Sequence, residues 1–294
     1  MSYLKKRYYR IIESIIKRII KIKENSKNEN FKRTIRSAIY NSGFKNKNLI
    51  YSDNNEIKYL MQSYDRVSKK IFIDQTFDDG ILKKAVKILK IKKFKYTLIN
   101  VGAHIGSTCV PAIKRKYFKN LIAFEPSKNN FNLLSANIFI NNIADRTKLF
   151  NIALSKNKSY VKIKKFQNSG DYRVVKSKQN NLELVKCDIL DNYTNKLNKK
   201  NSLIFMDAQG HEPFIFLGSK KTFRKKIPVV FEFAPFLMNK NWIKSFDQIF
   251  KHYKYFYDLQ TPLKKEKLTK QEVIKLYNRL SSYKDDAYTD LLIL

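Results

Sequence analysis

The chain has 294 residues, of which 43% are hydrophobic, and a formal net charge of +35 from 60 Lys and Arg against 25 Asp and Glu. This length and hydrophobic content allow one sizeable core and a smaller appendage. No uncharged apolar run approaches the roughly 18 residues of a membrane-spanning helix, and no signal peptide is recognisable, so we expect a cytoplasmic protein.

The basic excess points to an anionic partner such as nucleic acid, anionic lipid or an acidic glycan. Lys greatly outnumbers Arg, however, and it occurs in every segment together with Asn and Ile. Nucleic-acid sites usually concentrate Arg beside aromatic residues, so this even spread is more typical of a compositional bias. A nucleic-acid partner is therefore disfavoured but left open.

The cysteines and histidines form no metal-binding pattern. Cys109 and Cys187 lie far apart in apolar surroundings, which predicts buried free thiols in a reducing compartment. His104, His211 and His252 match no metal-ligand spacing, so we expect no metal.

Residues 3–23 are predicted to form an amphipathic helix, because Ile residues recur at helical spacing and Lys and Arg take the other faces. Such a helix can lie on an anionic membrane, and it can equally pack on the rest of the chain or on a second subunit. Lys32–Tyr40 is expected to form a second short helix, whereas residues 42–75 give no clear pattern. We interpret residues 1–75 as a basic helical extension.

Residues 76–294 are predicted to form a single α/β domain. After a helix at Asp79–Ile91, strands alternate with helices, which is typical of a doubly wound, mostly parallel sheet. Short strands at about 155–190 predict a β insert, and the T-x-x-E pattern at Thr269–Glu272 predicts the start of the last helix. The expected sheet strands are Tyr96–Val101, Leu121–Glu125, Lys148–Leu154, Leu203–Met206, Val229–Phe233, Tyr255–Leu259 and Leu291–Leu294.

A glycine turn follows the first of these strands, where the sequence reads TLINVGAHIGST. Gly102 permits a sharp turn and a close backbone approach, and Gly106 leaves the next helix N-terminus open to an anionic group. Glu125 ends the next strand about 20 residues further on, where a carboxylate can accept hydrogen bonds from two ribose hydroxyls. The pattern predicts a nucleotide-like ligand.

Two common nucleotide folds are excluded by the same turn. A dinucleotide fingerprint needs glycine at positions 104 and 107, which are His104 and Ser107 here. A kinase-type phosphate loop is excluded because no GK[ST] follows.

The ordered set of motifs resembles the FkbM-type methyltransferase family. The signatures are INVGAHIGST, IAFEPSKNNFNLLSANI, NIALS, LDNY, MDAQGHEPFIFLG and VFEFAP, and they extend over about residues 96–235. The resemblance implies a Rossmann-like class I methyltransferase fold that binds S-adenosylmethionine. Its sheet would have seven strands in the order 3-2-1-4-5-7-6, with the last strand antiparallel.

The resemblance also implies roles for individual residues. Glu125 would hold the ribose, Asn151 and Ile152 would lie near the adenine, and Asp207 would border the transferable methyl group. The family usually has Asp where Asn100 stands and Asn where His104 stands, so both positions depart from its pattern. The residues expected to face the methionine part of the cofactor are Asn100, Gly102, Ala103 and Gly106, and His104 is a further expected cofactor-binding residue.

Asp207, His211 and Glu212 are the candidate catalytic residues, because a hydroxyl acceptor benefits from a general base at the cofactor. The motif DAQG is unlike the [DN]PP[YF] of adenine amino-methyltransferases, and Glu232 alone does not supply the acidic pair of metal-dependent catechol-type enzymes. The resemblance favours O-methylation of a sugar, glycolipid or small metabolite. The alternatives are an RNA methyltransferase and a catalytically silent module that binds the cofactor or docks on a membrane.

Overall fold

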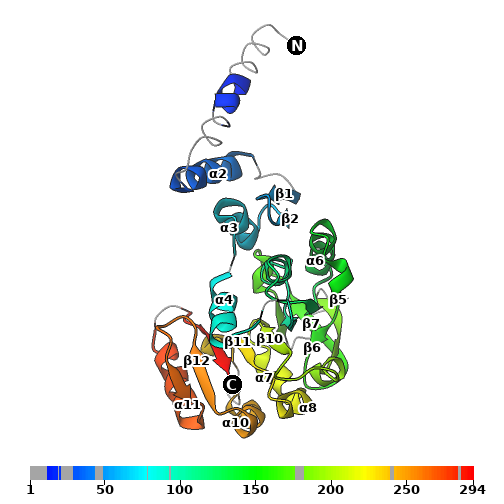
Figure 1. Cartoon of the computed structure of the whole chain (residues 1–294), viewed down its shortest axis with the longest axis vertical. Helices are drawn as coiled ribbons and strands as arrows, with labels where there is room; N and C mark the ends of the chain where they lie inside the picture. Colours follow the sequence, from blue (N-terminus) through cyan, green and yellow to red (C-terminus); the bar gives the residue numbers. More distant parts are fainter. Residues whose placement is uncertain are drawn as a thin grey trace.

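The computed structural model describes residues 12–18, 20, 29–43, 49–77, 79–92, 94–175, 182–238, 242–283 and 286–294. Within these ranges the chain forms one large sheet, two smaller sheets and the helices that cover them (Figure 1). None of the helices in the described ranges has the length and apolar character needed to cross a lipid bilayer.

The large sheet confirms the predicted α/β class. Its order is β13-β12-β14-β11-β10-β3-β4-β5; β3, β4, β5, β10 and β11 are parallel, and β14 is antiparallel to both its neighbours. Without β13, the strands numbered along the chain stand in the order 3-2-1-4-5-7-6. The bounds are β3 Thr97–Val101, β4 Asn120–Phe124, β5 Thr147–Phe150, β10 Ser202–Met206, β11 Val229–Phe233, β12 Tyr255–Asp258, β13 Lys265–Lys267 and β14 Thr289–Ile293.

The expected count of seven strands is wrong, because β13 adds an eighth at the edge. This strand is only three residues long, reads Lys-Glu-Lys and pairs antiparallel with β12. It has no apolar alternation, and it takes its conformation from the neighbouring strand, so the sequence pattern does not reveal it.

Helices cover both faces of the large sheet. Leu98 packs in one hydrophobic cluster and its neighbour Ile99 in the other, as expected for successive residues of a strand. The first cluster includes α4 (Asp79–Ile88), α5 (Cys109–Lys114) and α6 (Lys128–Ile140). The second includes α7 Glu212–Leu217, α8 Lys220–Arg224, α9 Trp242–Ser245, α10 Asp247–His252 and α11 Lys270–Ser281.

Several local predictions are confirmed. Thr269 caps α11, because its side chain accepts a hydrogen bond from the Glu272 N–H. Cys109 and Cys187 are buried and unpaired. The β insert forms a sheet in the order β6-β9-β7-β8. Its strands are β6 Ala153–Leu154, β7 Ser159–Lys164, β8 Arg173–Val175 and β9 Glu183–Asp188.

The N-terminal extension is helical only in part. Residues 12–18 and 20 are helical, and the other residues of the predicted helix at 3–23 lie outside the described ranges. The predicted short helix lies within α2 (Glu29–Gly43), but β1 (Leu49–Asp53) and β2 (Lys58–Gln62) form a hairpin before α3 (Arg66–Asp74). In Figure 1 these elements extend from one end of the part that contains the large sheet.

The hairpin is held by two asparagine side chains, one within α6 and one at the C-cap of this helix. Leu60 N–H donates to Asn137 Oδ1 (2.7 Å), and Asn137 Nδ2 donates to the Leu60 carbonyl (3.1 Å). Asn141 makes the same pair of bonds with Lys58, at 3.0 and 2.7 Å. Residues four apart on a helix and residues two apart on a strand are both separated by about 6 Å. The spacing of the two asparagines therefore equals the spacing of the two β2 residues that they bind.

We predict that Asn137→Ala destabilises the hairpin. The substitution leaves the Leu60 N–H and carbonyl without these partners, which should lower the free energy of unfolding by about 1–3 kcal/mol. Urea titrations measure this change in the free energy of unfolding. Hydrogen exchange of the Leu60 amide should also become faster in the variant.

Asn129→Ala is the matched control, because Asn129 is an exposed residue of the same helix. Equal protection of the Leu60 amide in both variants would contradict the proposed role of Asn137.

Candidate functional site

A cavity of about 740 Å³ lies at the carboxyl ends of the parallel strands, where open α/β sheets bind their ligands. The N-terminal extension contributes Arg66 and Lys70 to its wall, the insert contributes Tyr172 and Arg173, and the C-terminal segment contributes Tyr288. Of the residues predicted from the sequence, those that line the cavity are Asn100, Gly102, Ala103, His104, Glu125, Ile152, Asp207 and His211.

Gly102 is required by contact between two strand ends. Its φ is +75°, and a Cβ atom there would lie 1.7 Å from the carbonyl oxygen of Asp207. The Asp207 N–H donates to the Val101 carbonyl at 2.9 Å, which holds the two segments together. A side chain at position 102 would therefore clash with the backbone of Asp207, whether or not a ligand is bound.

Glu125 is fixed in place by two backbone donors. Its Oε2 accepts from the His104 N–H (2.8 Å) and its Oε1 from the Ser127 N–H (2.9 Å). The side chain is buried, and this burial raises the pKa of its carboxyl from 4.5 to about 7, despite the two donors. The carboxyl is thus oriented toward the cavity by the turn that contains His104.

Asn100 has an unused acceptor at the cavity. The residue is 1% exposed, its Nδ2 donates to the Phe205 carbonyl (3.3 Å), and its Oδ1 has no hydrogen-bond partner among the described residues. Within the same ranges, Ser127 Oγ and Asn130 Oδ1 are also buried without a partner. Such atoms are unusual in folded proteins, so they indicate a polar ligand in this cavity.

Three predicted residues do not line the cavity. A Cβ at Gly106 would lie 2.7 Å from Val110 Cγ2, so this glycine is required for packing of the helix that follows. Asn151 Nδ2 donates to the carbonyls of Glu125 (2.9 Å) and Pro126 (3.0 Å), which supports the end of β4. Glu212 is fully buried behind the cavity wall.

The two candidate bases differ in their surroundings. Asp207 Oδ1 accepts from Gln209 Nε2 at 2.8 Å. His211 Nε2 lies 3.1 Å from Ser155 Oγ, its ring stacks on Phe214, and burial lowers its pKa from 6.5 to about 4. His211 is therefore neutral at physiological pH.

Asp207, Glu212 and Glu232 bring three carboxylates together, with one oxygen of each within 4.8 Å of the others. Glu212 Oε1 accepts from the Ala208 N–H (2.6 Å), and burial raises the pKa of this carboxyl to about 8. In the sequence Glu232 stands apart as an isolated acid, because it lies on β11, whereas Asp207 and Glu212 share the MDAQGHE motif.

A hydrogen-bond network that the sequence did not reveal joins three parts of the chain. Asp65 Oδ1 accepts from the Val67 N–H at the start of α3, and its Oδ2 accepts from the N–H and the hydroxyl of Ser169. Ser169 Oγ in turn lies 2.6 Å from His104 Nε2. The extension and the insert therefore meet at the glycine turn, and no local pattern signals a contact between residues this far apart.

We predict a pH effect on stability from Glu125. The folded protein keeps this proton up to about pH 7, whereas the unfolded chain releases it near 4.5. The folded state thus binds more protons between these values, and raising the pH across them lowers the free energy of unfolding by up to about 1.4 kcal/mol per unit.

The measurement compares urea unfolding of the wild type and Glu125→Gln at several pH values. The stability of the wild type relative to the variant should decrease from pH 5 to pH 7. Parallel curves would show that this carboxyl does not titrate with a raised pKa.

A family model for the methyltransferase FkbM domain matches residues 100–258. The matched region contains Asn100, Glu125 and the three carboxylates of Asp207, Glu212 and Glu232. No curated protein is significantly similar to the chain.

Several solved structures resemble the chain distantly. Methyltransferase FkbM from Methylobacillus flagellatus KT has 13% identity and a TM-score of 0.38, covering 68% of this chain and 44% of that one, so the chain spans less than half of its length. M. jannaschii TYW2, solved in complex with AdoMet, has 12% identity and a TM-score of 0.41, and the match covers 85% of this chain and 87% of that one. An rRNA methylase from Streptococcus thermophilus has 8% identity and a TM-score of 0.40, and the match covers 74% of this chain and 97% of that one.

Proposed function

The chain belongs to the FkbM family of S-adenosylmethionine-dependent methyltransferases, and we propose that it methylates a hydroxyl group of a sugar, a glycolipid or a small metabolite. The observation that carries this proposal is Asp207, a carboxylate at the end of β10 that lines the cavity and is oriented by Gln209. A hydroxyl acceptor needs such a base, because it loses its proton when it gains a methyl group.

The polar groups of the cavity suit S-adenosylmethionine. Glu125 offers a carboxyl to the ribose hydroxyls, and the unpaired Asn100 Oδ1 is an acceptor for the ammonium group. Ile152 and Leu154 add apolar surface for the adenine. We assign Asn100, Ala103 and His104 to the methionine part, with Gly102 and Gly106 shaping the turn and Asn151 supporting it from behind.

S-adenosylmethionine supplies a methyl group activated by a positively charged sulfur. The protein's task is then to orient the acceptor in line and to remove its proton. We assign proton removal to Asp207 over His211, because Asp207 lines the cavity with its carboxylate oriented by Gln209, whereas the His211 ring lies against Ser155 and Phe214. We assign Glu212 a supporting role, because its Oε1 accepts from the Ala208 N–H and fixes the segment after β10.

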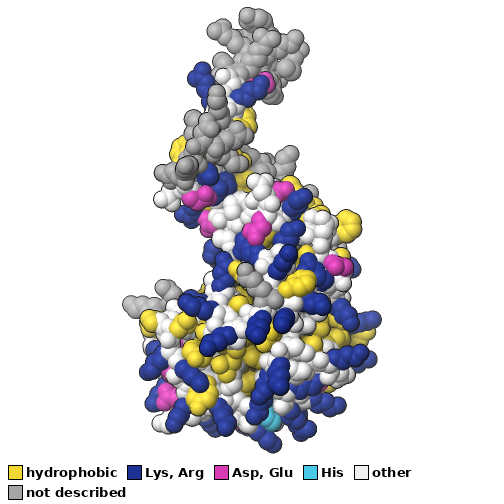
Figure 2. Space-filling model, viewed as in Figure 1, with side chains coloured by type: hydrophobic (Ala, Val, Ile, Leu, Met, Phe, Trp, Pro, Cys, Tyr) yellow, Lys and Arg dark blue, Asp and Glu magenta, His cyan; other side chains and the backbone are white. Residues whose placement is uncertain are grey.

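A second candidate function is RNA methylation. The residues of the cavity wall favour it, although the even spread of Lys and Arg along the sequence does not. Arg66, Arg173 and Tyr172 line the cavity together, and the Arg173 guanidinium lies 5.1 Å from the Phe166 ring centroid. Arg beside aromatic rings is a common arrangement in single-stranded RNA sites. Figure 2, in contrast, shows Lys and Arg spread over the visible face without gathering at one place, so we rank this candidate second.

We predict that Asp207→Asn lowers the rate of methyl transfer about 10²–10⁴-fold, the usual cost of losing a general base. Cofactor affinity should change much less, because the side chain keeps its shape. The assay uses a labelled methyl group and cell extract divided into glycan, lipid, RNA and small-molecule fractions.

His211→Ala is the comparison and should cost less. If His211→Ala is inactive and Asp207→Asn remains active, His211 is the general base. Label in the RNA fraction alone would favour the second candidate, and bound cofactor without label anywhere would favour a catalytically silent module.

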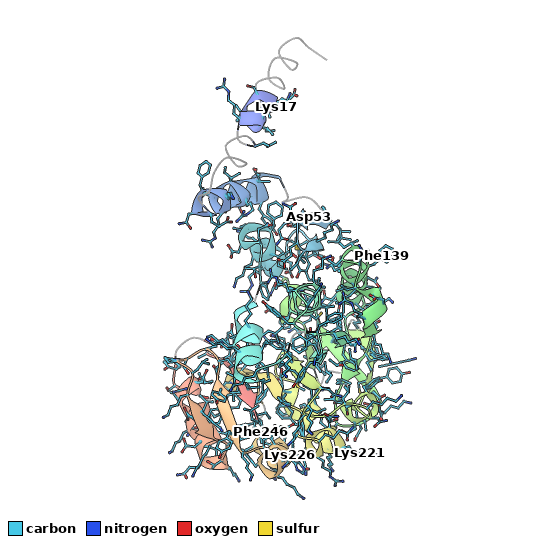
Figure 3. All side chains as sticks on the ribbon, in the orientation of Figure 1. Lys17, Asp53, Phe139, Lys221, Lys226 and Phe246 are labelled. Carbon is cyan, nitrogen blue, oxygen red and sulfur yellow. The ribbon has the colours of Figure 1, made fainter. Side chains whose placement is uncertain are left out.

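We also propose that the protein is cytoplasmic and contacts anionic membranes through residues 3–23. Ile15, Ile16 and Ile20 are each about half exposed, in the same helical segment as Lys17 and Arg18. Figure 3 shows the segment with Lys17 standing apart from the catalytic part. An apolar stripe beside basic side chains suits the interface of an anionic bilayer.

We predict that replacing Ile15, Ile16 and Ile20 with Ser reduces sedimentation with phosphatidylserine vesicles. Ile39→Ser is the control, because Ile39 is similarly exposed but lies on α2. Unchanged sedimentation of the triple variant would contradict the membrane proposal and favour a protein contact for this stripe.

A further inference from the structure

We propose that Asp207, Glu212 and Glu232 bind one hard divalent cation of the Mg²⁺ or Mn²⁺ type. The three residues follow β10, begin α7 and lie in β11, and an oxygen of each falls within 4.8 Å of the others. Carboxylate oxygens converging from three directions are the donors that these cations prefer. This site goes beyond cofactor binding and methyl transfer.

The separate observation that points to a ligand is the orphaned oxygen of Glu212. The residue is 0% exposed, and while Oε1 accepts from the Ala208 N–H, Oε2 is buried with no hydrogen-bond partner among the described residues. Within the same ranges no Lys or Arg forms an ion pair with it. A buried oxygen without a hydrogen-bond partner is costly, and a cation that replaces the proton of this carboxyl would satisfy it.

The surroundings favour an oxygen-preferring metal. Gln209 Nε2 lies 2.8 Å from Asp207 Oδ1 and 3.5 Å from Glu232 Oε2, so the amide stands between two of the carboxylates. Rotation of this amide would present its oxygen to the same point. Zinc sites normally use Cys or His ligands, and the cluster contains neither, while His211 of the same segment has its Nε2 beside Ser155.

The location gives the cation access to ligands. Asp207, Gln209 and Glu232 all line the cavity, so a bound metal would have protein oxygens on one side and open coordination positions on the other. A metal placed there could hold an acceptor hydroxyl and make its proton easier to remove. That use rests on the proposed function, whereas cation binding itself does not.

The experiment measures Mn²⁺ binding to the full chain after treatment with a chelator, using the electron paramagnetic resonance signal of free Mn²⁺. We expect one Mn²⁺ per chain, and at least about tenfold weaker affinity in Glu212→Gln and in Glu232→Gln. Glu212→Gln retains an oxygen for the Ala208 N–H, and Glu232→Gln provides a second test if the first variant does not fold.

Asp286→Asn is the matched control, because Asp286 is an exposed acid of the same cavity outside the cluster. It removes the same charge and should bind Mn²⁺ as the wild type does. With a net charge of +35, the protein repels cations in general, so stoichiometric binding reports a specific site.

Three results would overturn the proposal: no stoichiometric Mn²⁺ binding, equal binding in wild type and both cluster variants, or equal loss in Asp286→Asn. If Mn²⁺ does not bind and Glu212→Gln loses S-adenosylmethionine binding, the three carboxylates would instead interact with the positive charge of the cofactor. The Mn²⁺ measurement involves no acceptor and no methyl transfer. A negative result would therefore not contradict the proposed function, and a negative methyl-transfer assay would not affect the Mn²⁺ measurement.

Discussion

The close contact between Gly102 and the carbonyl of Asp207 determines where the polar groups of the site can meet. With a Cβ excluded at Gly102, the end of β3 lies directly against the end of β10. The segments after the two strands are built alike: His104 and Gln209 both have left-handed backbone conformations, and both line the cavity. Non-glycine residues rarely adopt this conformation, so the surrounding contacts must hold them there.

For His104, part of this support comes from outside the core fold. His104 is held through its N–H by Glu125 and through its ring by Ser169, which in turn is held by Asp65. The N-terminal extension and the insert thus restrain the same turn that we assign to the methionine part of the cofactor.

The sequence predicted the residues whose role follows from their place on one strand. Glu125 and Asp207 are identifiable because each stands at the carboxyl end of a buried strand. Asn151 occupies a similar position, but its amide supports the carbonyls of Glu125 and Pro126. Asp65 and Ser169 could not be paired, because their contact depends on packing between the extension and the insert. The convergence of Glu212 with Glu232 likewise depends on the packing of α7 against β11, which no local pattern records.

The asparagines that hold the hairpin have a further effect on solubility. A strand with free N–H and carbonyl groups is a template on which another chain can add a strand, and many proteins protect such edges. Asn137 and Asn141 occupy the edge of β2 with side-chain amides that imitate a neighbouring strand. Because they project from a helix, they end the sheet without offering a new edge. The helix therefore ends the β-sheet at this edge, and losing these amides would expose the edge to pairing with another chain.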